Sequence, residues 1–123
     1  MKKIVLAVAI LAASVGSALA VDFASPMNMI DGKTPMRNED KSIVTLGEVS
    51  ENALLAQFPD EQTLAGEEKM KRFALARRIH EQRKDPVLTA EDVALLKRLI
   101  GKAYSALVVG QAYGLLDPAS VAK

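Results

Sequence analysis

The strongest helical pattern in this sequence of 123 residues lies in residues 88–116. Apolar residues recur there at alternating spacings of three and four, and others widen the stripe on both sides. Because successive helical residues are about 100° apart, the apolar arc covers roughly half of the circumference. Other helices or a partner must cover such an arc, so we take one side of it as a candidate interaction face. The members of this face are Leu95, Leu99, Ala103, Tyr104, Leu107 and Val108.

Local signals bound this stretch but leave its continuity open. Thr89 and Asp92 have the spacing of a capping box, which predicts that a helix begins there. Pro118 predicts its end, since the residue before a proline is pushed out of the α region. Three glycines, which weaken a helix interior, are expected to be points of close packing. They are Gly101, Gly110 and Gly114. One continuous helix and a break near Tyr104 are both compatible with this pattern.

A helix is also predicted over about residues 45–57. Thr45 and Glu48 have capping-box spacing, in which the hydroxyl binds the amide of Glu48 and the Glu48 carboxylate binds the amide of Thr45. Pro59 predicts its end. The predicted inner face consists of Leu46, Val49, Ala53 and Ala56, with Leu54 and Leu55 beside it.

Another helix is predicted over residues 67–82. Acidic residues fill its first turn and basic residues its end, in agreement with the helix dipole. The predicted apolar arc consists of Phe73, Leu75, Ala76 and Ile79, with Met70 at its edge. Oppositely charged pairs four residues apart are Glu67–Lys71, Glu68–Arg72 and Arg77–Glu81.

Residues 21–44 lack helical periodicity and form a predicted N-terminal arm. Asp31 and Gly32 indicate a tight turn, and residues 37–42 a second one. The arm is either a short irregular hairpin or an extended, loosely packed segment. Its methionines are expected to pack against the protein and not to bind a cofactor. The predicted fold is all-α, a small bundle of three to four helices in residues 45–118, followed by a tail, 119–123.

Residues 1–20 have the three parts of a secretory signal peptide in the right order. Two lysines precede an uncharged apolar run, and small residues follow it up to an A-x-A site made by Ala18 and Ala20. We predict cleavage before Val21, which places the mature chain in the periplasm or outside the cell. As an alternative, the segment stays uncleaved as a single membrane anchor, although it only just reaches the ~17 residues of a short spanning helix.

The composition argues against several kinds of chemistry. The chain has no cysteine and one histidine, His80, so it lacks thiolate nucleophiles and the usual ligand set of a zinc site. No glycine-rich phosphate-binding loop is present. We therefore expect no catalytic residue, no cofactor and no metal, and we expect His80 to be a partly exposed side chain near a helix end.

The charge pattern predicts no nucleic-acid partner. Without the two lysines of the signal segment, 14 of the 16 basic side chains remain against 15 acidic ones, a net charge of −1. The densest basic stretch is residues 69–84, but its side chains fall on both flanks of the helix and have acidic neighbours. A solvated, ion-paired face is the expected arrangement.

Several stretches carry a resemblance to a known group of proteins. They are TLGEVSENALL (45–55), GEEKMKRFALARRIH (66–80), LTAEDVALLKRLIGKAY (88–104) and LVVGQAYGLLD (107–117), preceded by MNMIDGKTPM (27–36). Over about residues 21–117 the chain resembles a family of small helical proteins encoded in tailed-bacteriophage genomes. The resemblance implies a helical fold and an accessory role in virion assembly, without catalytic residues. A cytoplasmic assembly factor has no use for residues 1–20. The resemblance therefore implies a cytoplasmic protein, whereas residues 1–20 imply an exported one.

Together these patterns predict an exported, non-enzymatic helical protein that binds a protein partner or forms a homo-oligomer. Its contact with a membrane would be transient and limited to the signal segment. The first alternative is a phage accessory protein that acts in the cytoplasm during virion assembly. The second is a helical domain held at the inner membrane by a single helix.

We predict that the protein recovered from cells begins at Val21. The small side chains of Ala18 and Ala20 fit the narrow pockets of a signal peptidase, and the apolar run before them suits the translocon. Mass spectrometry of the periplasmic fraction should show the loss of residues 1–20. A full-length product in the membrane would identify an anchored domain, and an intact Met1 in the cytosol would favour the assembly factor.

Overall fold

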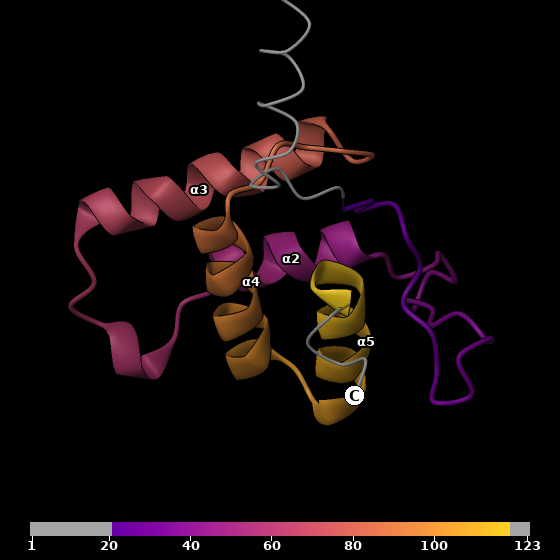
Figure 1. Ribbon diagram of the computed structural model, residues 1–123. Helices are drawn as coiled ribbons and strands as arrows, with labels where there is room; N and C mark the ends of the chain where they lie inside the picture. The colour runs from indigo at the N-terminus through magenta and orange to yellow at the C-terminus, as the bar shows by residue number, and fades with distance from the viewer. Residues whose placement is uncertain (1–20, 119–123) are drawn as a thin grey trace, which may run out of the picture.

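The computed structural model describes residues 21–118. Four α-helices and one short 3-10 helix make up the described part (Figure 1). They are α2 (Leu46–Leu55), η1 (Pro59–Glu61), α3 (Gly66–Glu81), α4 (Ala90–Ala103) and α5 (Ala106–Leu116). Within residues 21–118 there are isolated β-bridges but no strand, so the predicted small all-α bundle is confirmed. The predicted signal segment with Ala18 and Ala20, and the predicted tail 119–123, lie outside the described residues.

α2 begins at a capped N-terminus. The amide of Glu48 donates to Thr45 Oγ1 at 3.2 Å, which satisfies one of the free amides of the first turn. The other half of the predicted capping box is wrong: the Glu48 carboxylate accepts from Asn38 Nδ2 at 3.2 Å instead of the Thr45 amide, and so anchors the arm. The helix ends at Leu55, earlier than predicted, because Ala56 already has extended backbone angles. Leu55 and Ala56 consequently face solvent, and the prediction that Ala56 belongs to the inner face is wrong.

α3 buries a narrower apolar stripe than predicted. Its buried apolar residues are Leu75, Ala76 and Ile79. Phe73 is 45% exposed, so its prediction as part of the buried arc is wrong. The buried position one turn before the apolar residues belongs to Arg72, which is only 4% exposed. Because neighbouring residues on a helix are about 100° apart, Phe73 turns away from the stripe that Arg72 joins.

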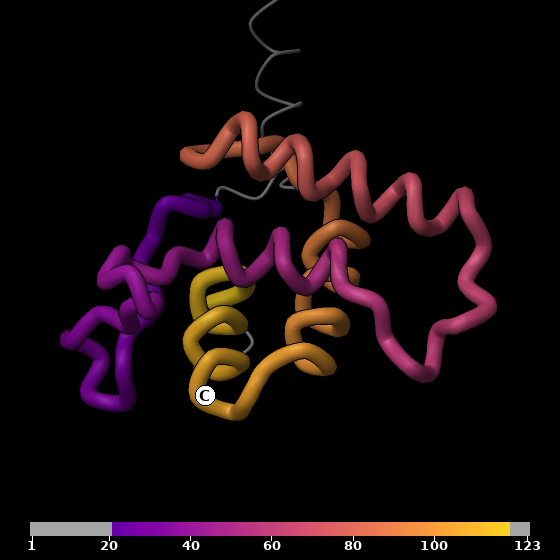
Figure 2. The backbone as a smooth tube through the Cα atoms, turned by 180° about the vertical axis from the view of Figure 1, so that it is seen from behind, coloured from indigo at the N-terminus to yellow at the C-terminus, as the bar shows by residue number. Residues whose placement is uncertain are grey.

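The chain after Thr89 forms two helices and not one. α4 begins with a complete capping box, in which the Asp92 amide donates to Thr89 Oγ1 at 3.1 Å and the Thr89 amide donates to Asp92 Oδ2 at 3.0 Å. Tyr104 has extended backbone angles, φ −131° and ψ 166°, which end the helix. α5 begins after Ser105 and returns beside α4 (Figures 1 and 2).

Tyr113 ties α5 to α4. Its hydroxyl donates to the carbonyl oxygen of Lys97 at 2.6 Å. Gly101 makes room for this contact, since a Cβ at that position would lie 2.9 Å from the Tyr113 hydroxyl. Gly101 is therefore a point of close packing, as predicted. Nothing lies within 4 Å of a Cβ placed on Gly110, so the same prediction is wrong for that residue.

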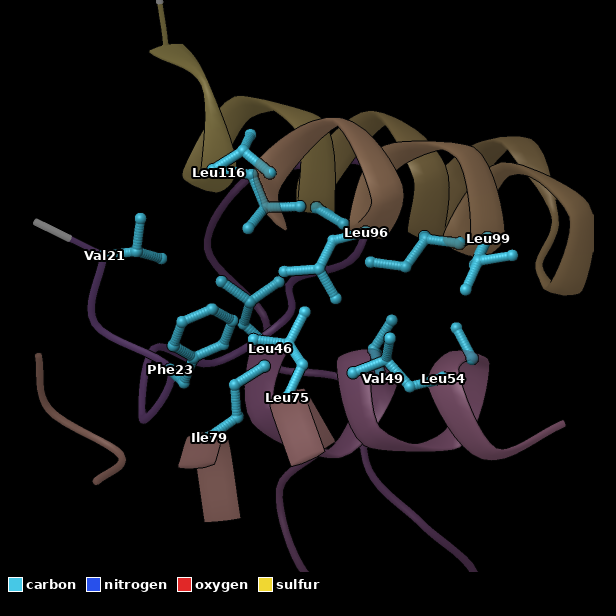
Figure 3. Packing of buried hydrophobic residues seen from close by; sticks show 14 of the residues in the cluster. Val21, Phe23, Leu46, Val49, Leu54, Leu75, Ile79, Leu96, Leu99 and Leu116 are labelled. Carbon is cyan, nitrogen blue, oxygen red and sulfur yellow. The ribbon is translucent and has the colours of Figure 1, made fainter. Parts of the chain in front are cut away.

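The hydrophobic core lies between α2 on one side and the α4–α5 pair on the other (Figure 3). Leu46 and Val49 of α2 face Leu96 of α4 across it. α2 contacts α3, α4 and α5, so it is the central helix of the bundle. The largest fully buried apolar side chains are Phe23, Met27, Leu46, Ile79, Leu88, Leu96, Leu99, Ile100 and Leu116.

The N-terminal arm is packed against the bundle through its first residues. Phe23 and Met27 are fully buried, and the Phe23 carbonyl oxygen accepts from the Gly47 amide at 2.8 Å. Further along, the arm has a turn at Asp31 and Gly32, where Gly32 adopts a positive φ of 74° that favours glycine. The Asp31 carboxylate accepts from two backbone amides of the same turn, at 2.8 and 2.9 Å. The arm is therefore an irregular folded segment and not a loose one.

We expect Leu46→Ala to lower the free energy of unfolding by about 3 kcal/mol, because it removes a fully buried side chain from the central helix. Leu55→Ala is the matched control, since the same truncation on the same helix affects a side chain that is 57% exposed. It should cost less than about 1 kcal/mol. Denaturant titration of both variants measures the difference, and equal losses would contradict the burial of Leu46 in the core.

Candidate functional site

A cavity of about 600 Å³ lies between the end of α2, the η1 segment and the first turns of α3. We call it the α2–α3 cavity. Its main lining side chains are Leu54, Leu55, Phe58, Leu64, Lys69 and Arg72. Its volume is in the usual range of small-molecule sites, and it combines an apolar wall with a few charged groups. The loop that carries η1 lies at one end of the bundle, opposite the N-terminal arm (Figures 1 and 2).

A cluster of charges around Glu61 holds this loop in place. The Glu61 carboxylate accepts from Arg72 Nη1 at 2.7 Å and from Arg72 Nη2 at 3.1 Å, a two-bond pairing. Lys102 Nζ lies 3.1 Å and Arg98 Nη1 3.4 Å from the same carboxylate. Lys102 also pairs with Asp60 at 3.0 Å. The cluster therefore connects η1 with both α3 and α4.

The electrostatics of Glu61 follow from these partners. The hydrogen bonds from Arg72 are the largest cause that lowers the pKa of Glu61, with Lys102 adding to them against the cost of burial. Its pKa falls from 4.5 to about 2. Glu61 is consequently ionised at any physiological pH, and its negative charge is already matched by cations.

Two hydrogen-bond donors at the α2–α3 cavity, by contrast, lack a close acidic partner. Lys69 lines the cavity and makes no ion pair with any residue of the described chain. The buried Nε of Arg72 has no hydrogen-bond acceptor, and the nearest carboxylate oxygen, on Glu68, is 4.0 Å away. The side chains that line the cavity thus include more cations, Lys69 and Arg72, than anions, Glu61.

A second ionic cluster joins the end of α3 to α2. Glu51 of α2 binds Arg83 Nη1 and lies 3.3 Å from His80 Nδ1. The Arg83 guanidinium rests against Gly47, where a Cβ would overlap it at 1.9 Å from Nη1. The backbone amide of Phe23 donates to the Arg83 carbonyl oxygen at 2.7 Å. This cluster fastens the arm, α2 and the end of α3 together.

His80, the only histidine, is a surface side chain in this arrangement. It is 70% exposed, which agrees with the predicted position near a helix end. Glu51 is shared with Arg83, and no group of three or more potential metal ligands occurs within residues 21–118.

The arginines of the predicted basic stretch point to different acidic partners. Besides Arg72 and Arg83, Arg77 pairs with Glu81 at 3.3 Å, and Arg78 pairs with Asp92 of α4 at 3.3 Å. The Arg77 pair lies within α3 and the Arg78 pair joins α3 to α4, so the cations are not collected on one face.

The predicted interaction face is largely used inside the bundle. Leu99 is fully buried, so its place on an interaction face is wrong. Leu95, Tyr104 and Val108 are partly buried and pack against the core, and Leu107 is also partly buried. Ala103 is exposed. Part of the face is covered within the bundle because α5 packs against α4.

A different apolar surface lies on the outer side of α5 and on the nearby arm. α5 has no charged residue, yet only Ala112 and Leu116 are fully buried in it. Gln111 Nε2 approaches the Met29 carbonyl oxygen at 3.4 Å, which brings the arm turn next to α5. Ile30 on that turn is 88% exposed. We define the α5–arm surface by Met29, Ile30, Ala106, Leu107, Gly110 and Gln111.

No described helix, α5 included, is both long and apolar enough to cross a membrane.

The sequence pattern did not reveal the α2–α3 cavity or the Glu61 cluster. Arg72 gave the one available signal, since it occupies a position of the apolar stripe of α3, one turn before Leu75 and Ala76. A cation in such a position needs a buried acidic partner. The sequence does not show that this partner is Glu61, because the loop that carries it closes on α3 only in the folded chain.

Comparison with known proteins gives no match: no family model fits the sequence, and no curated protein and no solved structure is significantly similar. The resemblance to phage-encoded helical proteins therefore stays a prediction.

We predict that Glu61→Gln lowers the free energy of unfolding by about 2 kcal/mol, because it weakens charge-assisted bonds to the buried Arg72. In the parent protein the folded pKa of Glu61 is below the unfolded one. Its contribution is therefore complete above pH 4.5 and is lost as the pH falls toward about 2. The variant should lose that part of the pH dependence.

The matched control is Glu81→Gln, which removes the exposed pair with Arg77. It should cost less than about 0.5 kcal/mol and leave the pH dependence unchanged. Urea titrations between pH 2 and pH 7 measure both effects. Parallel pH profiles for Glu61→Gln and the parent would contradict the assignment of this cluster.

Proposed function

We propose that this chain is an exported, non-enzymatic helical protein that acts by binding protein through the α5–arm surface. The proposed partner is a second copy of the same chain. The observation that carries the proposal is α5, an uncharged helix of 11 residues in which most side chains are only partly buried. Apolar patches of this kind, on a small protein with limited surface, are typical of association sites.

Self-association is favoured by the chemistry of the surface. A twofold axis places the same patch on both sides of an interface, so charged residues near the axis would face the same charge on the partner. The α5–arm surface avoids this repulsion because none of its members is charged. Gly110, with open space where a Cβ would be, allows another helix to approach closely, and Ile30 provides a protruding apolar side chain.

Export is supported by the sequence of residues 1–20. Val21 and Phe23 are buried in the core, so the bundle includes the first residues after the predicted cleavage site. The non-enzymatic role is supported by the chemistry of the described side chains, among which Glu61 and Glu51 are bound in ion pairs. Cell fractionation separates this proposal from a cytoplasmic assembly factor and from an anchored domain.

Gly110→Arg tests the proposed surface. A Cβ added at this position meets nothing within 4 Å in the monomer, and the change replaces a residue that weakens helices, so the fold should persist. In the dimer the same arginine would place a charge and extra volume in the interface. We expect sedimentation velocity to show a dimer for the parent protein and a monomer for the variant.

Ala74→Arg is the control, since it adds the same charge to an exposed position on α3, away from α5. It should leave the dimer intact, and circular dichroism should show native helix content for both variants. A parent protein that sediments as a monomer at all accessible concentrations, without a co-purifying partner, would contradict the proposal. Equal dissociation by both variants would argue against this surface in particular.

A further inference from the structure

The α2–α3 cavity has walls of two kinds, and it lies apart from the α5–arm surface. One wall is apolar and includes Leu54, Leu55 and Leu64. Leu55 is 57% exposed, although it is a large aliphatic side chain on the central helix. Covering such a side chain with an apolar group is favourable in proportion to the area removed from water. The apolar wall therefore suits a ligand with an aliphatic part.

The charged wall favours an anion. Glu61, the acidic residue of the lining, is bound by Arg72, Arg98 and Lys102, so its charge does not repel an incoming anion strongly. Lys69 lines the same cavity without an acidic partner in the described chain. A lysine has a flexible aliphatic stem, so its ammonium group can follow a ligand at the edge of an apolar wall.

The cavity is better suited to a small molecule than to a peptide main chain. Peptide recognition by main-chain pairing needs an exposed sheet edge, and residues 21–118 contain no strand. One unpaired cation next to an aliphatic wall matches a ligand with a single acidic group and a single chain.

We propose that the α2–α3 cavity binds an aliphatic carboxylate of medium chain length. The chain packs against Leu54, Leu55 and Leu64, and the carboxylate pairs with Lys69. Binding involves no covalent step and does not depend on the proposed association through α5. The protein would then be a carrier or sensor of an amphiphilic acid as well as a partner of other proteins.

Calorimetric titration of the protein recovered from cells with sodium decanoate tests this proposal, with decanol as the uncharged probe. We expect one saturable site for decanoate and about threefold weaker binding of decanol, the scale of one exposed ion pair. Leu55→Asp should weaken the binding of both probes by about tenfold or more, because it places a charge in the apolar wall.

Lys69→Glu and Lys71→Glu form a matched pair of variants. Both reverse one exposed charge on the same helix, but only Lys69 lines the cavity. We expect Lys69→Glu to weaken decanoate binding by about tenfold, as attraction becomes repulsion, and to leave decanol binding unchanged. Lys71→Glu should change decanoate binding by less than about twofold.

Four results would overturn the proposal. The first is the absence of saturable decanoate binding in a protein whose circular dichroism shows an intact fold. The second is equal affinity for decanoate and decanol, which would remove the role of the carboxylate. The third is an equal effect of the two lysine variants, which would place the charge recognition outside the cavity. The fourth is that a peptide with apolar and acidic residues binds to the protein and decanoate does not, which would make a peptide the ligand in place of a small molecule.

Discussion

The burial of one side of α2 is the constraint on which the rest of the structure depends. Leu46, Val49 and Leu54 face the α4–α5 pair, and α3 packs along the same helix from another side. A helix of 10 residues is too short to be stable alone in water, so its structure depends on these contacts. α3 and α4 pack extensively against α2, whereas α5 packs mainly against α4 and touches α2 less. The core therefore closes only when all four described helices are in place.

Ionic contacts hold α3 in addition to its three buried apolar residues, Leu75, Ala76 and Ile79. Arg72 within the helix pairs with Glu61, and Arg83 just after it pairs with Glu51. Both acidic partners come from outside α3, so each pair joins segments that are distant in sequence. Since Arg72 is nearly inaccessible, loss of its partner would leave a buried cation without compensation, which costs far more than loss of an exposed pair.

The two surfaces left over from this packing have different chemistry. The α5–arm surface is uncharged and exposes Ile30, which suits contact with another protein surface. The α2–α3 cavity is concave, with an aliphatic wall and the unpaired Lys69, which suits a small amphiphilic acid. They lie on different parts of the bundle, since one is formed by α5 and the arm turn and the other by the ends of α2 and α3. Either can therefore be altered without removing a residue of the other.

The sequence by itself determined the class of the fold, the starts of α2 and α4 and the arm turn. Thr45, Thr89 and Asp31 act through hydrogen bonds to amides within three residues, so their effect is local and can be predicted. The break at Tyr104 was left open, because weak helix formers lower stability without deciding where a helix ends. Only the tertiary structure decided that Leu99 is buried, that Phe73 is exposed and that Arg72 meets Glu61. These outcomes depend on which helix covers which face, and periodicity along one helix contains no information about its neighbour.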